Sequence, residues 1–212
     1  MPEIVLNCQN LPCPEPVIRT KRLLEAQDPE EVLVVVDNEA ALENVSRFLT
    51  SQGYDVSHTR EPGLCFVAAL KKGAMALAAP QLTRAASAAP FAPPFAHDAE
   101  SEKTLLMIIS PVFGSGDDAL GMQLMKNFLA TLPEIGTSLW RVVLLNGGVT
   151  LALRDSRVLA ELQALEAAGV NIFVCGTCLE HFGHFSQKAV GQTTNMLDVV
   201  TSIQVADKVI RI

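Results

Sequence analysis

The chain of 212 residues has little positive charge and no long apolar run, and each shortage excludes a class of protein. Sixteen Lys and Arg residues face 23 Asp and Glu residues, the net charge is −7, and no basic cluster is present. Nucleic acid is therefore not an expected partner. No stretch of about 18 apolar residues, the length of a membrane-spanning helix, is free of charged, polar or proline residues. The opening MPEIVLNCQN lacks the basic and apolar regions of a secretory signal, so we expect a cytoplasmic protein without membrane association.

Cysteine is also scarce, with five residues in the whole chain. An odd number this small is not typical of a disulfide framework, and in a cytosolic protein it indicates reactive thiols together with core residues. The cysteines are therefore the candidate reactive residues.

Residues 1–73 alternate between strand and helix patterns. Strands are predicted at 4–7, 31–38, 54–60 and 64–72, and helices at 14–26 and 39–53. This β-α-β-α-β-β order predicts a two-layer sandwich, with both helices on one face of a four-stranded sheet.

Residues 74–103 are rich in Ala and Pro and keep no strand or helix period, which predicts a linker, although a part such as AMALAA could form a helical turn. A second domain is expected at 104–212. Strands are predicted there at 104–110, 139–146, 170–174 and 208–212, and helices at 117–132, 156–169 and 195–206. The apolar strands indicate a parallel sheet in a three-layer α/β/α domain, whose sites form at the carboxyl ends of the strands.

Cys13 stands between two prolines in LPCPEPV, where the first helix is expected to begin. Pro14 suits the first helical position, because its missing N–H costs nothing there. Cys13 would then lie at or next to the helix cap, where free N–H groups and the helix macrodipole favour the nucleophilic thiolate. The alternative is that Cys13 only fills a cap position beside proline.

A second pair, Cys175 and Cys178, follows a predicted strand in CGTCLEHFGH. Such a pair can cycle as a redox disulfide, or it can accept sulfur or selenium on one thiol and release it with the other. With His181 and His184 it could bind zinc, but these ligands are crowded into ten residues, so no metal and no cofactor is expected. The pair could also be inert thiols in a loop.

Four other positions are assigned simpler roles. Cys65 is expected in the core, and Cys8 is a candidate to resolve a modified Cys13. Asp117 is expected to cap a helix, and the Asn-Gly-Gly sequence at 146–148 is expected to be a turn near the site.

Residues 4–72, with LNCQNLPCPEPVIRTKRLL, resemble the TusA/SirA-like sulfur-carrier family, in which the cysteine of Cys-Pro-x-Pro carries a persulfide. The resemblance implies this role for Cys13. Asn7 stands where Asp is common and Asn10 where Gly is common. Because Asn tolerates positive φ, the second change is expected to preserve the backbone turn.

Residues 104–212 are similar to the DsrE-like family, in which a cysteine after a central strand receives sulfur; Cys175 and Gly183 match that loop. The order of the two domains, with GSGDDALG, CGTC and VGQTTNM, resembles the YedF-type selenium-metabolism family. This implies a sulfurtransferase-like carrier that relays persulfide or selenosulfide between Cys13 and the Cys175/Cys178 site, with donor and acceptor proteins as partners and self-association plausible. A thiol-disulfide oxidoreductase and a non-enzymatic adaptor or redox sensor are the alternatives.

Overall fold

The computed structural model describes residues 4–72 and 102–212, and the chain divides into two compact units between Ala99 and Glu100. The predicted linker at 74–103, including AMALAA, lies outside the described residues except for its last two positions. Each unit is therefore considered by itself.

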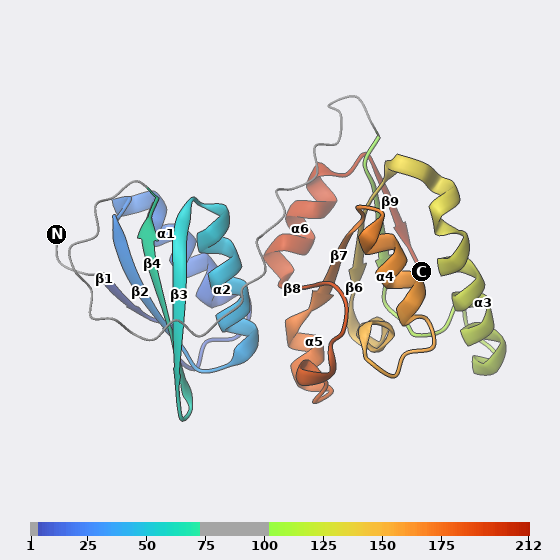
Figure 1. The fold of residues 1–212 in the computed structure, drawn as a ribbon, viewed down its shortest axis with the longest axis horizontal. Helices are drawn as coiled ribbons and strands as arrows, with labels where there is room; N and C mark the ends of the chain where they lie inside the picture. Colours follow the sequence, from blue (N-terminus) through green and yellow to red (C-terminus); the bar gives the residue numbers. More distant parts are fainter. Residues whose placement is uncertain (1–3, 73–101) are drawn as a thin grey trace. The chain divides into compact units, whose positions relative to one another are not determined.

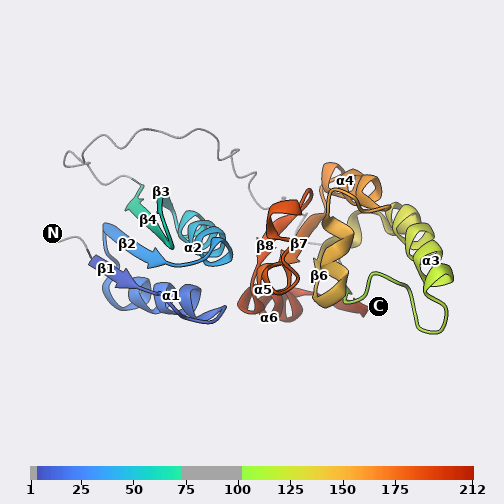
Figure 2. The same cartoon turned by 90° about the horizontal axis from the view of Figure 1, so that it is seen from below.

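The first unit contains four strands and two helices in the predicted order. They are β1 (Ile4–Asn7), α1 (Glu15–Gln27), β2 (Glu31–Val36), α2 (Glu39–Ser51), β3 (Tyr54–Glu61) and β4 (Leu64–Lys71). The sheet order is β1-β2-β4-β3, with β1 parallel to β2 and the other neighbours antiparallel. Both helices cover one face of the sheet (Figures 1 and 2), which confirms the two-layer prediction.

The core of this unit follows from two periodicities. Alternate residues of β4, namely Cys65, Val67 and Ala69, are buried, as the period of two in a strand requires. The buried face of α2 carries Leu42, Val45 and Leu49, at helical spacing. Asn38 begins α2, because its side chain accepts a hydrogen bond from the Ala41 N–H at 2.7 Å.

The second unit is built on five parallel strands. Its strands and α-helices are β5 (Thr104–Ile108), α3 (Asp118–Thr131), β6 (Leu139–Leu144), α4 (Leu159–Ala167), β7 (Asn171–Cys175), α5 (Gly176–His181), β8 (Gln192–Thr194), α6 (Met196–Val205) and β9 (Lys208–Arg211). Three short 3-10 helices add to them: η1 (Leu132–Ser138), η2 (Asn146–Ala152) and η3 (Phe185–Gln187). The sheet order is β8-β7-β6-β5-β9, so β9 and β8 form the edges.

Helices cover both faces of this sheet, as the apolar strands predicted (Figure 1). On one face, Met125 of α3 and Leu162 of α4 pack against Leu106, Ile108 and neighbouring strand residues. On the other face, Val199 of α6 packs with Leu105, Val143 and Phe173. The unit is therefore a three-layer α/β/α fold, and the carboxyl ends of its strands lie at one edge of the sheet.

Two features of the second unit were not predicted. The short strand β8 pairs with β7 through only three residue pairs, from Phe173↔Gln192 to Cys175↔Thr194. Its sequence, Gln-Thr-Thr, is polar and too short to show a strand period. The CGTC motif forms the end of β7 and the start of α5, so the prediction that both cysteines lie in a loop is wrong.

No helix in residues 4–72 or 102–212 is long and apolar enough to cross a membrane.

Each unit encloses its own sheet and core, so we expect residues 1–75 and 100–212 to fold as separate proteins. Circular dichroism should show a cooperative thermal transition for each piece, and the two transitions should together reproduce that of the full chain. A piece that shows no cooperative transition, while the full chain does, would contradict the division into two folding units.

Candidate functional site

The first candidate thiol, Cys13, lies half-buried in the loop between β1 and α1. Side-chain oxygens hold this loop. Asn7 Oδ1 accepts a hydrogen bond from the Gln9 N–H at 3.0 Å, and Asp37, just beyond β2, accepts one from the Asn10 N–H. The loop is therefore fixed to the ends of both β1 and β2, the two strands that flank the thiol.

The two asparagines of this loop keep its conformation. Asn10 has φ +54°, in the left-handed region, which confirms that the residue preserves a turn for which glycine is common. Asn7 uses its side-chain oxygen as an acceptor, and an aspartate at that position could accept the same hydrogen bond.

The start of α1 differs in detail from the prediction. Pro14 is the N-cap and not the first helical residue, so Cys13 immediately precedes the cap. The Glu15 N–H donates to the Pro12 carbonyl at 2.8 Å, and the Val17 N–H donates to the Pro14 carbonyl at 3.0 Å. These N–H groups are therefore not free, and Pro14 and Pro16 supply none. The case for a thiolate at Cys13 rests on the macrodipole of the 13-residue helix instead.

Positive charge on α1 is partly compensated. Arg19 pairs with Glu15, with 3.2 Å between Nε and Oε1, and Lys21 Nζ lies 3.8 Å from Glu25 Oε1. Exposed pairs of this kind weaken the field that the cations exert on a nearby thiol. Arg22 forms no ion pair with any residue that the structure describes, so no carboxylate there compensates its positive charge.

Cys8 and Cys65 are buried in the first unit. Burial raises the pKa of the Cys8 thiol; the charge of Arg19 lowers it and that of Glu15 raises it by smaller amounts. Burial also raises the pKa of Cys65, and the charge of Glu39 adds to this effect. Both thiols are therefore held in their neutral form, which fits the predicted core role of Cys65 and weighs against Cys8 as a resolving nucleophile.

The second candidate site joins Cys175, at the end of β7, to Cys178 in the first turn of α5. The Cys175 side chain belongs to the core of the second unit and is 5% exposed. Cys178 is half-buried and packs on the edge of the same core. Of the two thiols, Cys178 is the one that a reactant from solvent meets first.

A backbone donor contacts the Cys178 sulfur. The Asn146 N–H donates a hydrogen bond to Cys178 Sγ, with an N–S distance of 3.2 Å. Asn146 follows β6, begins η2 and has φ +48°. This contact fixes the position of the Cys178 sulfur relative to η2. Sequence reasoning treated residues 146–148 as a turn and missed this contact; the available signal was a glycine pair directly after a buried strand, at the same sheet edge as CGTC.

Gly148 allows η2 to reach this position. A Cβ atom there would lie 2.3 Å from the Ile108 carbonyl oxygen, so only glycine permits this close approach to the end of β5. At Gly147 the atom nearest to an added Cβ would be a Pro111 side-chain carbon, at 3.0 Å, and the nearest backbone oxygen, that of Ile109, would be 3.9 Å away. The position of the Asn146 N–H therefore depends on the packing of η2 against β5.

The two histidines after CGTC do not join a metal site. Within residues 4–72 and 102–212, no group of three or more His, Cys, Asp or Glu side chains could hold a metal ion. The His181 ring packs edge-on against Phe182, with centroids 5.1 Å apart, and the His184 ring lies 6.5 Å from the same phenyl ring.

Asp117 is a helix cap, as predicted. Its side chain accepts a hydrogen bond from the Leu120 N–H at 2.7 Å and so begins α3.

The profile of the DsrE/DsrF-like family matches residues 102–212, just over half of the chain. The chain belongs to this family. Residues 4–72 match the profile of a second family, sulfurtransferase TusA. The protein thus joins a TusA-like unit to a DsrE-like unit.

Known relatives match the two units separately. A candidate sulfur carrier protein from Methanocaldococcus jannaschii is 43% identical over 61 residues, which cover 28% of this chain and 81% of the relative. Among solved structures, a SirA-like protein from Desulfitobacterium hafniense is 27% identical with a TM-score of 0.30, and covers 32% of this chain and 95% of its own. A protein of unknown function from Methanobacterium thermoautotrophicum is 20% identical with a TM-score of 0.42, and covers 53% of this chain and 100% of its own.

We expect iodoacetamide at about pH 7 to label Cys13 and Cys178 well before Cys8 and Cys65. The first two are half-buried, whereas burial raises the pKa of the other two, so their thiolate fraction at this pH is smaller and increases only as the pH approaches the raised pKa. Peptide mass spectrometry after timed quenching measures each rate. Fast labelling of Cys65 in the native protein would contradict its buried position in the core of the first unit.

We expect Gly148→Ala to slow alkylation of Cys178, because the added Cβ displaces η2 and with it the Asn146 N–H. Unfolding free energy should fall by about 1–3 kcal/mol, as for other overpacked sites. Gly147→Ala is the matched control, since the atom nearest to its added Cβ belongs to the Pro111 side chain. Cys13 in the TusA-like unit is the internal reference for the alkylation rate. Equal rates of Cys178 alkylation in both variants and in wild type would mean that the hydrogen bond from the Asn146 N–H does not affect the reactivity of this thiol.

Proposed function

We propose that the protein carries sulfur as a persulfide on Cys13 and relays it to the Cys178/Cys175 pair. The observation that carries the proposal is the presence of two half-buried thiols, Cys13 just before α1 and Cys178 in the first turn of α5, in units of the TusA and DsrE/DsrF-like families. Both families and the M. jannaschii relative support a role in sulfur transfer. The persulfide, the order of transfer and the site residues are our assignments.

The proposed transfer is a sequence of thiolate displacements. The Cys13 thiolate attacks the outer sulfur of a donor persulfide, a new S–S bond forms on Cys13, and the donor leaves as a thiolate. The Cys178 thiolate then attacks the outer sulfur of the Cys13 persulfide and releases Cys13. Each step exchanges one S–S bond for another, so no external oxidant or reductant is consumed, and donor and acceptor proteins are the partners required.

We assign Cys178 as the entry thiol of the second site. The motif alone pointed to Cys175, but Cys175 is 5% exposed, whereas Cys178 is half-buried and accepts the Asn146 N–H. A persulfide on Cys178 has two possible fates. An acceptor thiolate can take the outer sulfur, or Cys175 can attack Cys178 Sγ, which releases hydrosulfide and leaves a disulfide that a dithiol reductant must reduce.

Selenium is a second possible cargo, because a selenosulfide forms and transfers by the same displacements. The resemblance of the whole chain to the YedF-type selenium-metabolism family motivates this test. Loading from a cysteine desulfurase supplied with selenocysteine, in parallel with cysteine at equal concentration, compares the two elements, because each then arrives at the oxidation level of an enzyme-bound persulfide.

Incubation with a cysteine desulfurase and free cysteine should add one sulfur atom to Cys13, detected by mass spectrometry of the intact protein and its peptides. Cys13→Ser should abolish loading at the second site from this donor, whereas Cys178→Ser should trap the sulfur on Cys13. Cys65→Ser, a thiol assigned to the core, is the matched control and should load like wild type.

Two outcomes would favour the alternatives. A loss of two hydrogens at Cys175 and Cys178 that is as large in Cys13→Ser as in wild type would favour a thiol-disulfide oxidoreductase, because the relay forms this disulfide only from sulfur that Cys13 delivers. No mass change would favour an adaptor.

Transfer within one chain is tested by mixing loaded Cys175→Ser/Cys178→Ser protein with Cys13→Ser protein. An internal relay in wild type should have a rate that is independent of protein concentration, whereas transfer between the two variants should slow on dilution.

A further inference from the structure

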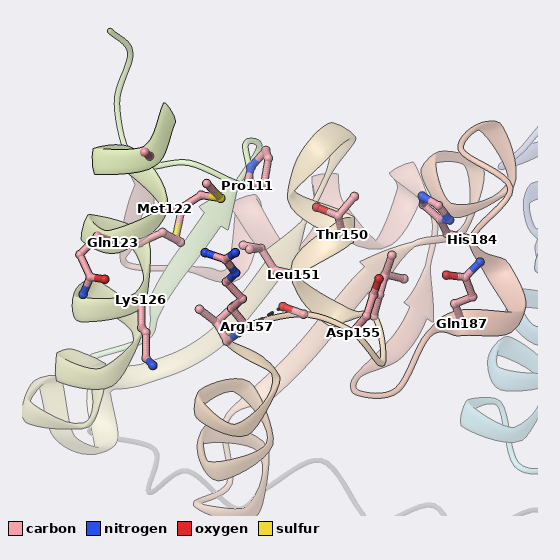
Figure 3. Close-up of a pocket in the computed structure, with 15 residues that line it drawn as sticks. Pro111, Met122, Gln123, Lys126, Thr150, Leu151, Asp155, Arg157, His184 and Gln187 are labelled. Carbon is pink, nitrogen blue, oxygen red and sulfur yellow. Dashed lines mark hydrogen bonds between the residues drawn. The ribbon is translucent and has the colours of Figure 1, made fainter. Parts of the chain in front are cut away.

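The DsrE-like unit contains a cavity of about 410 Å³ that no cysteine lines. It lies among segments that follow the carboxyl ends of β5, β6 and β7. Figure 3 shows α3 on one side of it, η2 and the segment leading to α4 in the middle, and the segment after α5 on the other side. This volume falls in the range of small-molecule sites, about 300–1,000 Å³.

The charged side chains around the cavity favour an anion. Lys126 lines it from α3 and Arg157 from the segment before α4 (Figure 3). Neither cation forms an ion pair with a residue in the described parts of the chain. Asp155 is the only carboxylate among the lining residues. The cavity therefore has an excess of uncompensated positive charge, although the whole chain is acidic.

The rest of the lining is divided between apolar and neutral polar groups. Met122 and Met125 form an apolar wall with Leu151 and Val158. Methionine is flexible and polarisable, so such a wall adapts to an apolar group of variable shape. Thr150 of η2, Gln123 of α3 and Gln187 after α5 offer hydrogen bonds.

His184 adds an unused hydrogen-bonding group. It lines the cavity, and its Nδ1 atom is buried without a hydrogen-bond partner. The His184 ring therefore gives the cavity a polar group that does not depend on Lys126 or Arg157.

We propose that this cavity is a binding site for a small organic anion, a carboxylate or a phosphate monoester that also carries an apolar group. Lys126 and Arg157 hold the charged group, and the methionine wall takes the apolar group. The proposal does not rest on sulfur transfer, because it uses none of the five cysteines, and either proposal can fail without the other.

Two-dimensional proton–nitrogen NMR of the full-length, nitrogen-15-labelled protein tests this site. Phenylacetate should cause saturable shifts of the amides of Thr150, Leu151 and Gln187. Phenylacetamide, its neutral analogue, should bind at least about three-fold more weakly, because exposed charge pairs contribute up to a few-fold in affinity. Phenyl phosphate in place of phenylacetate shows which charged group binds better, and inorganic phosphate measures the contribution of charge alone.

Lys126→Gln and Arg157→Gln should each weaken phenylacetate binding about two- to five-fold. Arg154→Gln is the matched control, since this exposed cation is near Arg157 in sequence and does not line the cavity. All three residues are on the surface, so unchanged spectra away from the cavity will confirm the fold. The proposal is overturned if phenylacetate causes no shift at these amides, if the amide analogue binds equally well, or if Arg154→Gln weakens binding as much as Arg157→Gln.

Discussion

The close approach of η2 to the end of β5 determines the geometry of the DsrE-like unit around its thiols. The absence of a side chain at Gly148 lets the backbone come into contact with the Ile108 carbonyl, which an added Cβ would meet at 2.3 Å. This contact sets the position of the Asn146 N–H, which donates to the Cys178 sulfur. Three consecutive strands thus contribute to one site: β5 supports η2, β6 leads into it, and β7 leads into the CGTC helix. A parallel sheet brings these segments together because its strands all end at the same edge.

The two units place a half-buried cysteine near the start of a helix by different local structures. In the TusA-like unit, prolines begin the helix and the early N–H groups bond to carbonyl oxygens, so the 13-residue helix acts on Cys13 through its macrodipole. In the DsrE-like unit, α5 has six residues, and a single N–H from another segment contacts Cys178 directly. The first arrangement is local in sequence, whereas the second joins residues 32 positions apart.

This difference explains what could be predicted from sequence. Apart from β8 and α5, the strands and α-helices of both units follow from apolar periodicity, and the positive φ of Asn10 follows from the known tolerance of asparagine. The N–H donor of Asn146 and the cavity with Arg157 and His184 could not be predicted, because they arise from the packing of segments distant in sequence. β8 was missed because three polar residues show no period, and α5 because a short helix at a strand end has few positions to reveal one.

In the proposed transfer, the burial of Cys175 determines the order in which the two cysteines of the second site react. With 5% of its surface exposed, this residue is shielded from large molecules in solvent, while Cys178 is within their reach. In the proposed transfer, the reactant that reaches Cys175 is therefore a modified Cys178, three residues further along the chain. Cys175 would react only after Cys178, and the interval between the two reactions would be the time in which a partner protein can collect the sulfur.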